Sequence, residues 1–132
     1  MKMLFVMTIV LALPAWAAGD VCPSSPNCVA SLVSGSKFIE PFPVSGDGRE
    51  DFVLLHKILL ERKDTTITAA DEERITVEFK TALGFVDDGL FVLDQKMKGI
   101  QVRSASRSGY WDMGKNRRRL ETIRREYLAR RP

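Results

Sequence analysis

Residues 85–107 read FVDDGLFVLDQKMKGIQVRSASR and contain two apolar segments on either side of a polar turn. The β-branched and aromatic residues of 85–93 and 100–107 favour strands. The polar residues 94–99, which end in a glycine, are typical of a hairpin turn. This part of the chain therefore predicts two antiparallel strands joined by a tight connection.

The pattern of side chains also predicts how the two strands pair. If the two ends of the turn face each other, Leu90 lies opposite Arg103 and Asp88 lies opposite Ala105. One face of the hairpin then gathers the apolar side chains of a core, namely Phe91, Leu93, Ile100 and Val102. On the other face, Asp88 is diagonal to both Arg103 and Arg107, within reach of their long side chains.

The segments on either side predict the rest of a small domain. Residues 65–69 and 74–80 are β-branched and partly alternating, which indicates two more strands. Apolar residues recur at helical spacing from about Asp51 to Lys63 and from Met113 to about Arg130. A chain of 132 residues can hold one domain and little else. We therefore predict an α+β fold with a small antiparallel sheet of about four strands and two helices.

The first residues have the pattern of a secretory signal peptide. Lys2 precedes an apolar run without charges, Pro14 ends this run, and Ala15-Trp16-Ala17 matches a signal-peptidase site. The run is shorter than the roughly 20 residues that a membrane span needs. The expected organisation is a signal peptide over 1–17, an extended arm over 18–48 and an α+β domain over 49–132. We expect export to the periplasm or secretion, with no integral membrane span in the mature chain.

The chain has two cysteines, Cys22 and Cys28, and one histidine, His56. In an oxidising compartment such a close pair of cysteines is expected to form a disulfide, which would shape the N-terminal arm. These residues supply too few ligands for a structural zinc site, so we predict neither a metal nor a cofactor. His56 lies beside the apolar stripe of the first helix, which favours a structural histidine over a catalytic base.

Charge is distributed unevenly along the chain. Acidic residues dominate up to Asp94, whereas 12 basic and 3 acidic residues lie between Gln95 and Pro132. An excess of this kind attracts anions. The expected partners are an anionic ligand of the cell envelope or an acidic protein. Nucleic acid is not expected, because an exported chain rarely meets it.

The second helix begins with an unusual concentration of cations. Lys115, Arg117, Arg118 and Arg119 crowd its first turns, where positive charge opposes the helix dipole. Asp112 is a natural N-cap for this helix. A buried carboxylate or a bound anion would satisfy both the cations and the first backbone N–H groups.

Three motifs stand out: Cys22-Pro-Ser-Ser-Pro-Asn-Cys28, Phe85-Val-Asp-Asp88 and the block VRSASRSGYWDMGKNRRR over 102–119. Together they resemble a widespread family described only as domain of unknown function 1499. The resemblance runs from about Cys22 to the end of the second helix. It implies a small domain, often exported or envelope-associated, with no established reaction. One departure is Leu90, where the family pattern D-D-x-E has a glutamate that could pair with Arg103.

The third motif supplies the candidate binding groups. Arginine guanidinium groups suit carboxylates and phosphates, and neighbouring serines can donate hydroxyl hydrogen bonds. The candidate ligand-binding residues are Arg103, Ser104, Ser106, Arg107, Lys115, Asn116, Arg117 and Arg119. Their expected ion-pair partners are Asp87, Asp88 and Asp112. We expect the edge of the hairpin and the first turn of the second helix to meet in one polar junction.

Three functions are compatible with this motif. The first is a non-catalytic module that binds an anionic ligand or partner through the basic residues. The second is a structural accessory protein whose arginines and aspartates lock the hairpin to the helix. In that case Arg103→Ala would unfold the domain, because an unpaired buried charge costs about 3–5 kcal/mol. The third is a hydrolase with Asp87 or Asp88 as general base, which we rank last because flanking arginines oppose the raised pKa that such a base needs.

Overall fold

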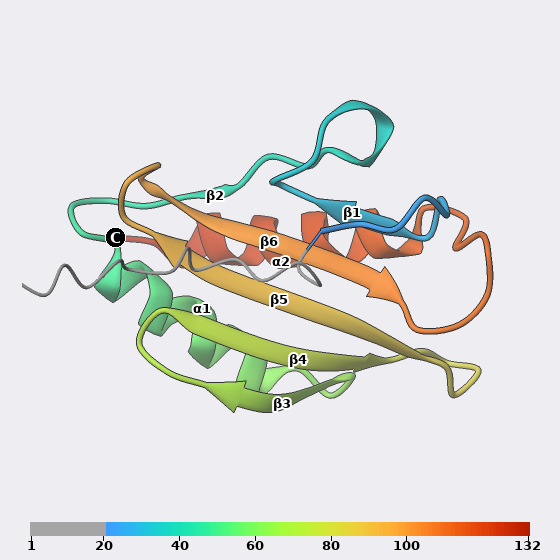
Figure 1. Ribbon diagram of the computed structural model, residues 1–132. Helices are drawn as coiled ribbons and strands as arrows, with labels where there is room; N and C mark the ends of the chain where they lie inside the picture. Colours follow the sequence, from blue (N-terminus) through green and yellow to red (C-terminus); the bar gives the residue numbers. More distant parts are fainter. Residues whose placement is uncertain (1–20) are drawn as a thin grey trace, which may run out of the picture.

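The computed structural model describes residues 21–132, so the predicted signal peptide lies outside the described residues (Figure 1). The elements in chain order are β1 (Cys28–Ala30), the 3-10 helix η2 (Gly35–Lys37), β2 (Phe42–Pro43), α1 (Arg49–Glu61), β3 (Thr65–Ala70), β4 (Arg74–Lys80), β5 (Val86–Asp94), β6 (Gly99–Ser106) and α2 (Lys115–Arg130). Within this part of the chain, no helix combines the length and the apolar character needed to cross a membrane.

The strands form one antiparallel sheet in the order β1-β6-β5-β4-β3, and β2 also pairs with β6. The α+β class and the two helices are confirmed, but the sheet has six strands rather than about four. The additional strands, β1 and β2, lie in the segment that we expected to be an extended arm. They are three and two residues long, too short to show a period of their own, and their pairing partner β6 lies far along the chain.

The hairpin of β5 and β6 has the predicted register. Leu90 pairs with Arg103, Asp88 pairs with Ala105, and Asp94 pairs with Gly99 at the turn. The four side chains expected in the core are buried, namely Phe91, Leu93, Ile100 and Val102. Leu90 and Val92, on the other face of β5, are buried as well, so the buried residues of this strand do not alternate with exposed ones.

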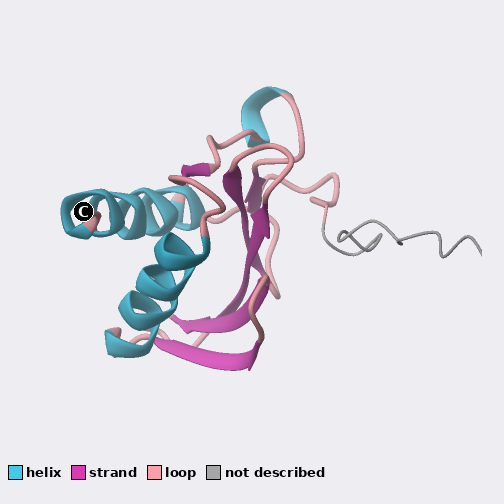
Figure 2. Cartoon of the chain, turned by 90° about the vertical axis from the view of Figure 1, so that its left-hand side faces the viewer, coloured by secondary structure: helices cyan, strands magenta, loops and turns pink. Residues whose placement is uncertain are grey.

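Both helices cover the same face of the sheet (Figure 2). Their buried side chains recur every three or four residues, as Phe52, Leu55, Ile58 and Leu59 in α1 and as Leu120, Ile123 and Tyr127 in α2. Two apolar residues within the range predicted for the second helix, Met113 and Leu128, are exposed instead. Met113 precedes the helix, which begins at Lys115. The core therefore lies between this one helical layer and the sheet.

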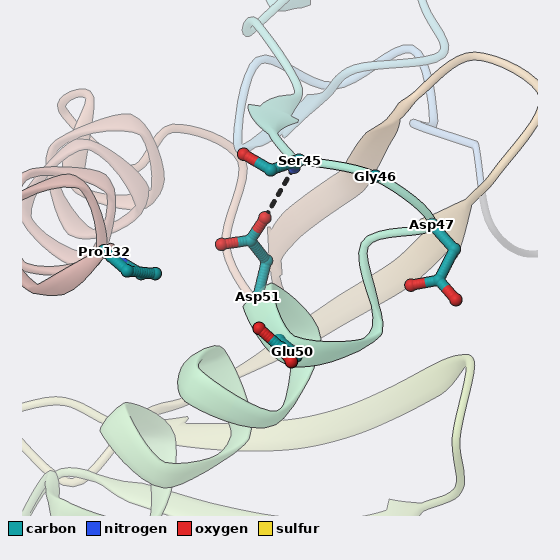
Figure 3. Close-up of a pocket in the computed structure, with 6 residues that line it drawn as sticks. All are labelled: Ser45, Gly46, Asp47, Glu50, Asp51 and Pro132. Atoms are coloured by element: carbon teal, nitrogen blue, oxygen red, sulfur yellow. Dashed lines mark hydrogen bonds between the residues drawn. The ribbon is translucent and has the colours of Figure 1, made fainter.

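The C-terminal end of the chain is attached to the beginning of α1. The guanidinium group of Arg131 donates hydrogen bonds to the carboxylate of Asp51, with Nε at 3.0 Å from Oδ1, and to the Ser45 hydroxyl at 2.8 Å. Asp51 is buried and also accepts the backbone N–H of Ser45 at 2.6 Å (Figure 3). The last residues thus hold α2 against α1 beyond their apolar contact.

Candidate functional site

The start of α2 is capped by Asp112, but not from the N-cap position that we predicted. The N-cap residue is Gly114, in the left-handed conformation with φ 74°. The carboxylate of Asp112 lies two residues earlier and accepts the N–H groups of Gly114 at 2.9 Å and Asn116 at 3.1 Å. The left-handed turn at Gly114 brings these N–H groups toward Asp112. A side chain of the protein therefore occupies the place of an anion at this helix end.

The hydrogen bonds to Asp112 also change its acidity. Partial burial alone would raise the pKa of this carboxyl, but the N–H groups of Asn116 and Gly114 outweigh the burial and hold the pKa below its ordinary value. Because the pKa is lower in the folded chain, the contribution of Asp112 to stability is complete above the unfolded-chain value of about 4. It is lost as the pH falls through the folded value.

We expect Asp112→Ala to lower the free energy of unfolding by about 1–2 kcal/mol at neutral pH, the cost of losing a helix cap. The difference from the wild type should shrink as the pH falls through the folded pKa of Asp112, because the wild-type carboxylate then becomes protonated. Urea denaturation at a series of pH values measures both effects. A difference that stays constant down to strongly acidic pH would contradict the assigned role.

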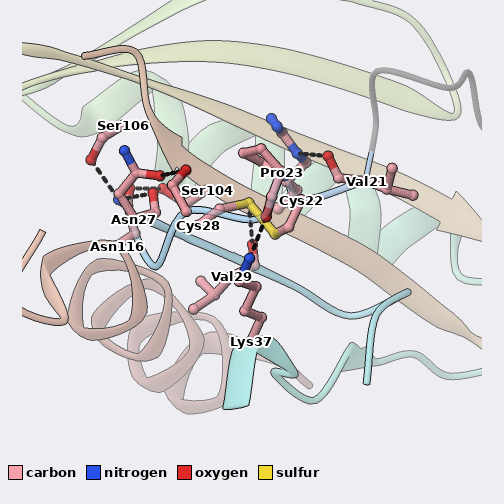
Figure 4. The surroundings of a disulfide bond; sticks show 12 residues. Val21, Cys22, Pro23, Asn27, Cys28, Val29, Lys37, Ser104, Ser106 and Asn116 are labelled. Carbon is pink, nitrogen blue, oxygen red and sulfur yellow. Dashed lines mark hydrogen bonds between the residues drawn. A yellow bond between two sulfur atoms is a disulfide. The ribbon is translucent and has the colours of Figure 1, made fainter. Parts of the chain in front are cut away.

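Asn116 joins three segments in a buried polar network (Figure 4). Its amide oxygen accepts the hydroxyl of Ser104 at 2.6 Å. Its amide nitrogen lies 3.0 Å from the hydroxyl of Ser106, 3.1 Å from the backbone oxygen of Asn27 and 2.7 Å from the carboxylate of Asp112, and these three acceptors share its two N–H groups. The serines of the motif therefore do meet the first turn of α2, as expected. Their hydroxyl groups are hydrogen-bonded to the side chain of Asn116.

Asp87 forms ion pairs with two of the predicted binding cations. Its side chain is 1% exposed, and its Oδ2 lies 2.7 Å from Nη2 of Arg119 and 3.2 Å from Nζ of Lys115. The side chain of Arg119 is itself 8% exposed, and its guanidinium lies over the ring of Phe79 at 4.6 Å. The second carboxylate oxygen of Asp87 has no hydrogen-bond partner among the described residues. This buried ion pair connects β5 directly to α2.

The two arginines of β6 and its end lie on the other face of the sheet. Successive residues of a strand point to opposite faces, so Arg103 and Arg107 cannot share a face with Ser104 and Ser106. Arg107 pairs with Asp88 at 2.6 Å and with Glu78 at 3.0 Å, and these hydrogen bonds raise its pKa.

Arg103, opposite Leu90, donates to the backbone oxygen of Val21 at 3.3 Å. The expected single junction is therefore divided. The serines, Lys115, Asn116 and Arg119 meet at α2, whereas Arg103 and Arg107 face away from it.

A hollow lies beside the start of α2, next to the predicted disulfide, which is present between Cys22 and Cys28. We call it the Lys37–Arg117 hollow, and its lining residues are Pro26, Cys28, Val29, Ser36, Lys37, Trp111, Asp112, Gly114 and Arg117. Arg117 donates to the backbone oxygen of Ser36 at 2.8 Å, and Lys37 donates to that of Pro23. The disulfide and the network of Asn116 thus fix both walls of this hollow.

The cations around this hollow differ from Lys115 and Arg119 in their ion pairing. Within residues 21–132, the salt bridges include no carboxylate partner for Lys37, Arg117 or Arg118. Arg118 is exposed and donates to the backbone oxygen of Met113 at 2.6 Å. Lys37 is not among the binding residues predicted from the sequence, since nothing in the arm indicates that β1 and η2 bring it to α2.

The other candidate groups offer little for catalysis. Asp87 and Asp88 are both ion-paired with cations. His56 is half-buried on α1, beside a hollow whose other lining residues are Arg49, Phe52, Val53, Asp71 and Glu72. That hollow contains no serine or cysteine that His56 could activate. Among the described residues, no group of three or more His, Cys, Asp or Glu side chains could hold a metal ion.

Comparison with known proteins gives one family. The model of the family described as protein of unknown function (DUF1499) matches residues 20–127. This range includes β1, the hairpin and most of α2, and thus the whole polar network around Asn116 and Asp87. Searches of the curated proteins and of the solved structures found no match. Because the family model matches most of the length of the chain, the chain belongs to the DUF1499 family.

Proposed function

We propose that this protein is a non-catalytic module of the cell envelope that binds an anionic group at Lys37, Arg117 and Arg118. One observation carries the proposal: Lys115 and Arg119 are both paired with the carboxylate of Asp87, whereas these three cations have no carboxylate partner among the described residues. An unneutralised cluster of two guanidinium groups and an ammonium group attracts phosphate, sulfate or carboxylate groups.

The surroundings of the cluster suit a ligand with an apolar part. The indole of Trp111 is exposed at the edge of the Lys37–Arg117 hollow, where it offers a flat surface beside the cations. The one carboxylate of the hollow, Asp112, is turned to the backbone of α2 by its hydrogen bonds to Gly114 and Asn116. It therefore opposes a bound anion less than a carboxylate aimed into the hollow would.

The proposed place of action is the periplasm or the exterior of the cell. The disulfide between Cys22 and Cys28 suits an oxidising compartment. The sequence pattern of the first 17 residues, which is that of a signal peptide, supports the same location.

A structural accessory role is the second candidate, and one observation favours it. Most of the family motif on the helix side, including Ser104, Asn116 and Arg119, is engaged in the buried network and is not available to a ligand. On this alternative the exposed cations only keep the protein soluble. The two candidate functions predict different results for substitution of the exposed cations: anion binding is lost on the first and does not exist on the second.

The test is a pair of double-charge variants in a thermal-shift experiment with inorganic phosphate, a sulfated oligosaccharide and a short-chain phosphatidylglycerol. We expect at least one of these probes to raise the Tm of the wild type, and added salt to reduce the shift. Arg117→Gln with Arg118→Gln should weaken binding at least about tenfold, since each lost hydrogen bond to a charged group is worth about 1.5–3 kcal/mol.

The matched control is Arg125→Gln with Lys57→Gln, which removes two exposed charges elsewhere on the helical layer. It should bind the probe like the wild type. If no probe shifts the wild-type Tm, or if the control weakens binding as much as the test variant, the anion-binding function is wrong and the structural role is favoured.

A further inference from the structure

Two neighbouring loops at one end of the sheet carry exposed apolar side chains. The first loop, residues 81–85, joins β4 to β5, and the second, residues 107–114, joins β6 to α2. Both lie at the right-hand end of the molecule in Figure 1, and the N–H of Arg107 donates to the oxygen of Val86 at 3.2 Å. The exposed residues of these loops are Leu83, Phe85, Tyr110, Trp111 and Met113, each between 55% and 86% exposed. We call them the apolar rim.

The backbone under the apolar rim is held in place. In the first loop, the N–H of Gly84 donates to the oxygen of Thr81 at 2.9 Å. In the second, the side chain of Asn27 donates to the oxygen of Gly109 at 2.6 Å. Met113 adopts a left-handed conformation with φ 57°, which is uncommon for a residue other than glycine. These contacts fix the loops in a conformation that leaves their apolar side chains exposed.

Cations lie beside the apolar rim. Lys37, Arg117 and Arg118 are next to Trp111 and Met113 through the Lys37–Arg117 hollow and the hydrogen bond of Arg118. Lys80 is exposed at the end of β4, directly before the first loop. Tryptophan and tyrosine combine an apolar ring with a polar atom and favour the boundary between lipid headgroups and acyl chains. Cations beside such residues match the negative potential of an anionic leaflet.

We propose that this end of the molecule docks on an anionic lipid bilayer, with the apolar rim in the interface and the cations on the headgroups. The inference rests on the proposed anion-binding function and names its ligand as the phosphate of a lipid headgroup. A soluble phosphate or sulfate would occupy the cations but would leave Leu83, Phe85 and Met113 in water. A bilayer contacts both parts of the surface at once.

The first experiment uses Trp111 as the reporter. The chain has two tryptophans, Trp16 and Trp111, so Trp16→Phe makes Trp111 the single emitter whether or not the leader has been removed. The protein is purified from the exported fraction and mixed with vesicles of equal parts phosphatidylcholine and phosphatidylglycerol. We expect the emission of Trp111 to shift to the blue and to be quenched by lipids brominated on their acyl chains. Vesicles of phosphatidylcholine alone should give neither effect at the same lipid concentration.

The second experiment separates the apolar rim from the cations. Leu83→Ser with Phe85→Ser removes two side chains of the rim and no charge, and we expect vesicle binding in a flotation assay to weaken at least about tenfold. The control is Met97→Ser, which alters an exposed apolar side chain at the turn of β5 and β6, at the other end of the sheet. It should leave vesicle binding unchanged, and circular dichroism checks that all variants are folded.

The outcomes distinguish this inference from the function on which it rests. If a soluble probe binds in an Arg117-dependent way but the emission of Trp111 does not respond to anionic vesicles, the docking proposal is wrong and anion binding stands. If no soluble probe and no vesicle binds, both are wrong. Equal binding of the Leu83→Ser, Phe85→Ser variant and the wild type to vesicles would also overturn the docking proposal. Capture of a folded acidic protein through the apolar rim without vesicle binding would favour a protein partner instead.

Discussion

Arg119→Ala should lower the free energy of unfolding by about 3–5 kcal/mol, the usual cost of removing one member of a buried ion pair. The side chain of Asp87 is 1% exposed, so its charge would be left in the protein interior with only the partly exposed Lys115 as a partner. The substitution also removes the guanidinium that lies over Phe79 and donates to Asn116 at 3.0 Å. Urea denaturation followed by far-UV circular dichroism measures the loss.

Two other arginines serve as controls for this prediction. Arg125→Ala makes the same change on the exposed side of α2 and should have little effect on stability. Arg107→Ala breaks an ion pair with Asp88 and Glu78, whose side chains are about half exposed so that solvent screens the charges, and should also have little effect. If Arg119→Ala costs no more than Arg107→Ala, the network is not what joins the hairpin to α2.

The substitution Asn116→Leu should be equally damaging, at about 3–5 kcal/mol. Leucine has the branched shape of asparagine but is larger, so the substitution leaves no cavity, and its effect combines the lost hydrogen bonds with overpacking. The side chain of Asn116 is fully buried, and its loss removes the acceptor of the Ser104 hydroxyl and the donor to the Ser106 hydroxyl. The measurement is again urea denaturation.

Hydrogen exchange adds a localised readout for Asn116→Leu. The N–H groups of β1 should exchange faster relative to those of β4, because Asn116 is bonded to the segment directly before β1 and not to β4. Arg125→Leu, on the exposed side of the same helix, is the control and should keep the wild-type pattern. A uniform increase of exchange over the whole sheet in Asn116→Leu would argue against a specific attachment of β1.

The hairpin could be predicted from the sequence to the residue, whereas the site could be predicted only in part. The turn at 94–99 sets the register of β5 and β6, and the pairs Leu90–Arg103 and Asp94–Gly99 confirm it. The alternation of side chains along β6 separates Arg103 from Ser104, although they are neighbours in one motif. The prediction that Arg103 and Arg119 lie in one junction is therefore wrong, because the pleat of the strand directs Arg103 to the other face. The buried arginine of the network is Arg119.

Other parts of the site depend on contacts distant in the sequence. Lys37 reaches α2 only because β1 pairs with β6 and carries the following turn with it. The attachment of Asn27 to Asn116 spans the whole domain and has no local signal. The exposed positions of Trp111 and Met113 result from the turn before α2, whereas the apolar pattern alone would include Met113 in the core stripe.

The pairing of β1 with β6 also determines when the sheet can be completed during synthesis. Synthesis proceeds from the N-terminus, so β1 leaves the ribosome well before β6, the strand with which it pairs, which follows more than half a chain later. The disulfide between Cys22 and Cys28, by contrast, closes within a short local ring and needs no distant partner. We therefore expect the cysteine ring to form early and the edge strand to dock late, and contacts of such long range make the final step slow.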